Sequence, residues 1–128
     1  MIMDLLADAI NIIKVNENVG LDSCSVRSTK LIKSVMEVMK TNGYIAEYSE
    51  FKDGKIAKLE IKLAKKINDV GVIKPRFAVG LDDFQKYETR YIPSRDFGIL
   101  ILSTPKGIMT NASAKEQHMG GRLLAYVY

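Results

Sequence analysis

The amino-acid sequence predicts a mixed α/β protein of the α+β kind, built from two small packed lobes. The N-terminal half shows helix-like and strand-like periods in the order α-β-α-β-β, and the C-terminal half is mainly β with a short helix. The Lys-rich segment 65–69 between them is typical of a hinge. We therefore expect lobes at residues 1–66 and 67–128, a division that suits a chain of 128 residues.

The first lobe follows from apolar spacing and turn residues. Asp4 can cap a helix over residues 4–15, and Ser28 or Thr29 can cap a second helix that Asn42-Gly43 ends. Strands are expected at 24–27, 44–51 and 56–63, with Asp53-Gly54 forming a hairpin between the last two. Residues 57–63 alternate between apolar and polar, so one face of the sheet should be buried and the other exposed to solvent.

The second lobe begins with a short strand at 70–73, stopped by Pro75, and another near Ala78. Residues 82–91 suit a helix that Pro93 ends, and a short helix is expected near 111–118. The apolar run 98–102 predicts a buried strand, and a last apolar strand follows the Gly120-Gly121 turn.

Composition narrows the function classes. The chain is 47% hydrophobic and 27% charged, which is globular, and no apolar run approaches the ~20 residues that span a bilayer. Its one cysteine, Cys24, allows neither an internal disulfide nor a cysteine-based zinc cluster. A single cysteine points to a protein of the reducing interior of the cell. The net charge is +4, and residues 52–76 hold eight Lys or Arg against three Asp or Glu. This basic stretch could bind phosphates, or it could be a solvated lysine-rich face.

The segment after the buried strand, Ser103-Thr104-Pro105-Lys106-Gly107, is the strongest candidate binding loop. Hydroxyls both donate and accept hydrogen bonds, which suits the 2′-hydroxyls and base edges of the shallow RNA minor groove. A lysine can bind phosphate, and a glycine permits close backbone approach. From these residues alone, an ordinary strand-to-helix connection with Thr110 capping the helix remains the alternative.

Several segments together resemble the small-subunit ribosomal protein S8 family. The loop through Ile108-Met109-Thr110 matches the S-T-x-K-G-x-M-T signature almost position for position, and the chain ending matches G-G-x-L-x-x-Y-V. Pro105 departs from the bacterial pattern, which usually has Ser there, and so removes one hydroxyl and one backbone N–H. Further matching segments, several typical of the archaeal and eukaryotic branch, are Asp4–Asn11, Ser28–Leu31, Asn42–Ile45, Lys74–Phe77, Arg95–Gly98 and Gly121–Tyr128.

The resemblance implies a non-enzymatic component of the cytoplasmic ribosome. Such a protein is a primary rRNA-binding protein that binds the central domain of small-subunit (16S-type) rRNA, helps assemble the platform and touches neighbouring small-subunit proteins, as a monomer within the ribosome. It implies no cofactor, metal or membrane. The implied RNA-binding residues are Ser103, Thr104, Lys106, Gly107, Gly120, Gly121 and Arg122, with Thr29 and Lys30 as a second patch.

Two other function classes are weighed against this. A small α/β enzyme or nucleotide-binding domain would need a phosphate loop, a carboxylate pair or a histidine-centred site. His118, the one histidine, has no nucleophile or carboxylate at a diagnostic spacing, and the G-x-x-x-x-G-K-[ST] pattern is absent. A protein-interaction module using apolar sheet edges is the third class, and its binding would persist at high salt.

Overall fold

The structure is a computed structural model that describes residues 5–74, 76–93 and 97–128. The chain divides into two compact units, Met1–Ile67 and Asn68–Tyr128. The proposed helix cap Asp4, the strand stop Pro75 and the Arg95-Asp96 part of the family motif lie outside the described residues.

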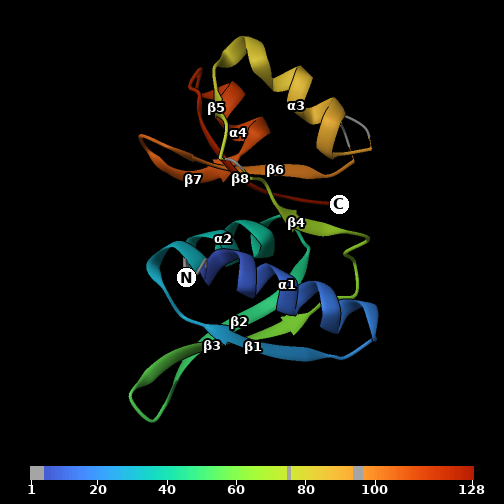
Figure 1. Cartoon of the computed structure of the whole chain (residues 1–128), viewed down its shortest axis with the longest axis vertical. Helices are drawn as coiled ribbons and strands as arrows, with labels where there is room; N and C mark the ends of the chain where they lie inside the picture. The colour runs from blue at the N-terminus through green and yellow to red at the C-terminus, as the bar shows by residue number, and fades with distance from the viewer. Residues whose placement is uncertain (1–4, 75, 94–96) are drawn as a thin grey trace. The chain divides into compact units, whose positions relative to one another are not determined.

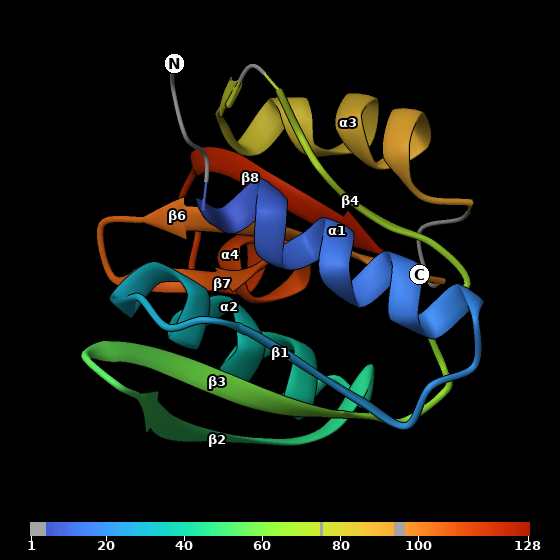
Figure 2. The same ribbon diagram turned by 60° about the horizontal axis from the view of Figure 1, so that its bottom comes forward.

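The first unit has the predicted order α-β-α-β-β (Figure 1). Its three strands form an antiparallel sheet in the order β1-β3-β2, and both helices lie on the same side of it (Figure 2). The alternation in β3 behaves as predicted, because Leu59, Ile61 and Leu63 are buried while Glu60 and Lys62 are exposed. The elements are α1 (Leu5–Asn18), β1 (Ser23–Arg27), α2 (Lys30–Thr41), β2 (Ile45–Asp53) and β3 (Ile56–Leu63).

Helix α1 is longer than predicted. The sequence predicts this helix only as far as residue 15, but the polar residues 16–18 form its last turn. The Asn16 side chain donates to the carbonyl of Ile12 at 2.7 Å and so stays within helical geometry. The sequence pattern missed this turn because polar residues at the exposed end of a helix carry no apolar period.

The second unit contains one antiparallel sheet with two helices on one face (Figure 1). The strand order is β4-β8-β6-β7, and β5 also pairs with β8. Phe84 and Tyr87 of α3, Ala114 of α4, and Leu100 and Leu102 of β6 share one buried cluster. The elements are β4 (Val70–Val72), β5 (Ala78–Val79), the 3-10 turn η1 (Leu81–Asp83), α3 (Phe84–Tyr91), β6 (Ile99–Thr104), β7 (Gly107–Thr110), α4 (Asn111–Glu116) and β8 (Gly121–Val127).

The prediction for the segment after the apolar run is wrong in one respect. Ser103 and Thr104 belong to β6 itself, and residues 107–110 form an additional strand, β7. The expected loop is therefore a β-hairpin. The sequence did not indicate β7, because the segment before it contains small hydroxyl residues and a proline, which are typical of a loop. Pairing with β6, rather than intrinsic strand propensity, stabilises β7.

No helix among the described residues combines the length and apolarity needed to cross a bilayer.

Candidate functional site

The β6–β7 hairpin presents a two-residue tip, Pro105-Lys106, because Thr104 pairs with Gly107. The Thr104 hydroxyl donates to the Gly107 carbonyl at 2.8 Å and accepts from the Lys106 N–H at 3.2 Å. Gly107 has a φ of +123°, a backbone conformation that residues with a side chain rarely adopt. Pro105 suits the tip, since its fixed φ favours a turn and no ladder N–H is lost there.

Ser103 and Thr104 were predicted as an equivalent pair, but their surroundings differ. Thr104 is 9% exposed and its hydroxyl already serves the turn. Ser103 is half-buried, and its hydroxyl has no hydrogen-bond partner within the described parts of the chain. Ser103 is therefore the hydroxyl that remains available to a ligand, and Thr104 shapes the hairpin.

Gly120 and Gly121 were predicted to form a tight turn, but Gly121 is instead the first residue of β8 and Gly120 directly precedes it. This glycine pair lies directly beside the hairpin. A Cβ on Gly121 would stand 2.1 Å from the Ser103 carbonyl oxygen, and one on Gly120 would stand 2.2 Å from the Val79 oxygen. Only glycine permits the start of β8 to enter between β5 and β6 this closely. The β6–β7 hairpin and the start of β8, which α4 separates in the sequence, are thus held together.

Arg122 adds a cation to the same place. It pairs with Ser103 across β8 and β6, so both side chains lie on one face of the sheet. Arg122 is exposed, and its guanidinium lies 3.5 Å from the Arg76 carbonyl, which it can reach as a weak donor. Lys106 is exposed at the hairpin tip. The structure therefore brings all seven predicted residues of the second unit to one end of its sheet.

The second predicted patch lies on the first unit, at the start of α2. Thr29 is the N-cap, and its hydroxyl accepts from the Ile32 N–H at 3.1 Å. Ser28, the other candidate cap, instead donates to Glu50 at 2.6 Å. That bond, followed by the one from Lys33, lowers the pKa of the Glu50 carboxyl. Lys30 is exposed on the first turn, where helix N–H groups favour an anion.

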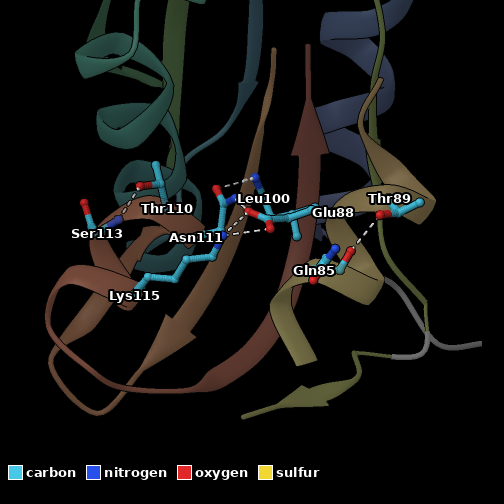
Figure 3. Close-up of polar contacts among 8 residues, drawn as sticks. All are labelled: Gln85, Glu88, Thr89, Leu100, Thr110, Asn111, Ser113 and Lys115. Carbon is cyan, nitrogen blue, oxygen red and sulfur yellow. Dashed lines mark hydrogen bonds and ion pairs between the residues drawn. The ribbon is translucent and has the colours of Figure 1, made fainter. Parts of the chain in front are cut away.

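A polar network that the sequence did not predict fixes α4, the helix between the hairpin and β8 (Figure 3). Glu88 of α3 is only 4% exposed. It accepts from the Asn111 amide and, at 2.7 and 2.6 Å, from the Lys115 ammonium. The Asn111 carbonyl oxygen accepts in turn from the Leu100 N–H of β6 at 3.2 Å. The one available signal was that Glu88 lies four residues after Phe84, on the apolar face of its helix.

Thr110 is the N-cap of α4, accepting from the Ser113 N–H at 3.1 Å. This is the structural role that the sequence suggested for it. Together with the network, the cap ties both ends of the short helix to fixed positions.

His118 and Cys24 occupy positions with ordinary structural roles. His118 is exposed just past α4, with a φ of 55°, the left-handed position that often ends a helix. Cys24 is half-buried in β1, and burial, followed by the nearby Glu17 carboxylate, raises its thiol pKa to about 11. Across residues 5–74, 76–93 and 97–128 no three His, Cys, Asp or Glu side chains form a group that could hold a metal.

The described residues form a small two-unit α+β protein, and the predicted site residues of its second unit gather at one polar end of that unit's sheet. The chain belongs to the ribosomal protein S8 family, whose model matches residues 4–128. It is 44% identical over 129 residues to the small ribosomal subunit protein uS8 of Methanococcoides burtonii, a match that covers 100% of this chain and 99% of that protein.

Membership in the family establishes the general role. The protein is a structural, non-enzymatic constituent of the small subunit of the cytoplasmic ribosome and takes part in translation.

Proposed function

We propose that the protein binds rRNA directly, in the central domain of the small-subunit rRNA, and helps assemble the platform. The observation that carries this proposal is the close contact of Gly121 with Ser103, since the hairpin, the Gly120-Gly121 pair and Arg122 lie side by side. The polar end of the sheet formed by Ser103, Lys106, Gly107, Gly120, Gly121 and Arg122 is called the hairpin–glycine surface below.

The chemistry of this surface suits the minor groove of an RNA helix. That groove is wide and shallow and displays 2′-hydroxyls, which both donate and accept hydrogen bonds. The Ser103 hydroxyl can do the same, and the backbone at Gly107 carries no side chain that would hold the RNA away. Lys106 and Arg122 supply cations for the flanking phosphates.

The start of α2 is a second contact in this proposal. The Thr29 hydroxyl is engaged in the cap, so its contribution is to order the first turn of the helix. The exposed Lys30 ammonium and the helix N-terminus then attract a phosphate. Both units would thus contribute to rRNA recognition, the second mainly through shape and the first mainly through charge.

The test is binding of the purified protein to a central-domain rRNA fragment at fixed salt. Ser103→Ala removes one hydrogen bond to the RNA and should weaken binding by about 1 kcal/mol, roughly fivefold. Lys106→Ala should weaken binding to matched and mismatched RNA alike and flatten the salt slope by about one unit at most.

Ser49→Ala, which alters an exposed serine on β2, is the matched control and should leave the affinity unchanged. Footprinting on the whole small-subunit rRNA should show protection in the central domain. Unaltered affinity of both hairpin variants, with the fold intact, or protection confined to another rRNA domain, would refute the proposal.

A further inference from the structure

Exposed apolar side chains are concentrated at one end of the first helix. Four of the eight large hydrophobic residues that are exposed in the described chain fall within ten positions. Scattered apolar residues on a surface are ordinary, but a contiguous group of them marks an interaction site. The four are Ile12, Val15, Val19 and Leu21, with 36%, 50%, 65% and 50% of their surface exposed.

Three of these residues form a continuous line on α1. Ile12, Val15 and Val19 recur at i, i+3 and i+7, the spacing of one helix face. Val19 lies just past the last residue of α1, but its N–H still donates to the Val15 carbonyl at 3.1 Å and continues the helical path. We call Ile12, Val15 and Val19 the α1 stripe; Figure 2 shows α1 lying with α2 over one face of the first unit's sheet.

The stripe is separate from the face of α1 that packs inside the first unit. The buried residues of the helix are Leu6, Ala9, Ile10 and Ile13. The unit's own core is therefore complete without the stripe. Two separate apolar faces on one helix indicate a second contact, made outside the first unit.

The charges around the stripe identify the kind of external partner. Asp8, which precedes Ile12 by one turn, is an exposed acid on the same side of the helix. Lys14, the one basic residue of α1, lies two positions from Ile12 and so points to a different side. An RNA surface needs cations to neutralise phosphates. This face offers apolar contact and an acid instead, which suits a protein with apolar side chains and a nearby cation.

We propose that the α1 stripe docks a neighbouring protein of the small ribosomal subunit, one whose contact surface combines apolar side chains with a lysine or arginine opposite Asp8. This inference rests on the protein's place in the small subunit. The α1 stripe is then the surface through which the expected contacts with neighbouring proteins are made, independently of the hairpin–glycine surface.

The first test is competitive incorporation into small subunits reconstituted from purified components. A stripe variant carrying Val15→Asp and Val19→Asp competes with the parent chain at equal concentration, and its share should fall about fivefold or more, because a charge is forced into an apolar contact. The matched control carries Ala46→Asp and Ser49→Asp, which add the same charges at exposed positions of β2, outside α1. The control should compete like the parent.

Two further measurements separate this proposal from the proposed rRNA binding. The stripe variant should bind the isolated central-domain fragment within about twofold of the parent, as expected for surface positions away from an interface. A photoreactive residue placed at Val15 should crosslink, in purified small subunits, to a basic ribosomal protein.

The outcomes are decisive in both directions. Equal incorporation of parent and stripe variant, equal loss in the control, a Val15 crosslink to rRNA or within the same chain, or no crosslink at all would overturn the α1 proposal. If rRNA binding itself fails for the parent, the proposed function falls, and the crosslink alone then decides whether the stripe holds a protein.

Discussion

The buried carboxylate of Glu88 makes Lys115→Met the most informative single substitution for the stability of the second unit. Glu88 is 4% exposed and receives the Lys115 ammonium through both oxygens, at 2.7 and 2.6 Å. Methionine keeps the length and apolar stem of the side chain but removes the charge. The carboxylate is then left with the Asn111 amide as its remaining partner among these groups.

The expected cost follows from burial. Removing one partner of a fully buried ion pair costs about 3–5 kcal/mol, because an uncompensated charge stays in the interior. The Lys115 side chain is 36% exposed, so water reaches part of the site and the expected loss is lower. We expect a decrease of about 2–3 kcal/mol in the free energy of unfolding.

The assay is urea unfolding of the full chain, with hydrogen exchange at the Leu100 amide as a local readout, since that amide donates to Asn111. Lys86→Met is a closely matched control. Lys86 also lies over an aromatic ring, at 5.4 Å from Tyr87 against 5.7 Å for Lys115 and Phe84, but no ion pair involves it within the described residues. The difference in unfolding free energy between the two variants therefore measures the contribution of the ion pair between Lys115 and the Glu88 carboxylate.

The double variant Glu88→Gln with Lys115→Met should recover at least half of the loss, because no buried charge is then left unpaired. If Lys115→Met costs no more than Lys86→Met, or Leu100 exchange is unaltered, the network does not stabilise the unit as argued.

Two further predictions concern residues that a catalytic interpretation would have used. The alkylation rate of Cys24 should rise with a midpoint near pH 11, since burial and the Glu17 carboxylate disfavour the thiolate, and a midpoint at or below pH 9 would contradict this. His118→Gly should raise the free energy of unfolding by about 0.5–1 kcal/mol, because glycine adopts a positive φ more readily. The same variant should leave rRNA affinity unchanged, and a tenfold loss of binding would show that the histidine belongs to the site.

The parts of the fold that were predictable depend on local signals. The alternation through Leu59, Ile61 and Leu63 and the Asp53-Gly54 turn are readable because each residue's neighbours in sequence are also its neighbours in the hairpin. The helix stop at Asn42-Gly43 is equally local, and Gly43 indeed has a φ of +82°.

The parts that were not predictable depend on contacts between distant segments. Strand β7 forms because residues 107–110 find a partner in β6, and nothing in their own sequence alternates. Glu88 and Lys115 are 27 positions apart, so no spacing rule relates them. Ser103 and Thr104 look interchangeable in the sequence, and only the turn geometry shows that one hydroxyl is already engaged.

These contacts also determine which substitutions can report on function. A Cβ on Gly121 would meet the Ser103 carbonyl, a backbone atom that cannot move aside alone, so any replacement displaces β8 from β6. A loss of binding in such a variant would reflect the displaced strand and would say nothing about a glycine–RNA contact. Thr104 variants carry the same ambiguity through the turn. Ser103 is different, because Ser103→Ala removes one polar atom without a partner in the described structure and leaves the backbone in place. The evidence for rRNA recognition should therefore be sought first at Ser103 and at the exposed Lys106, where structure and binding can be changed separately.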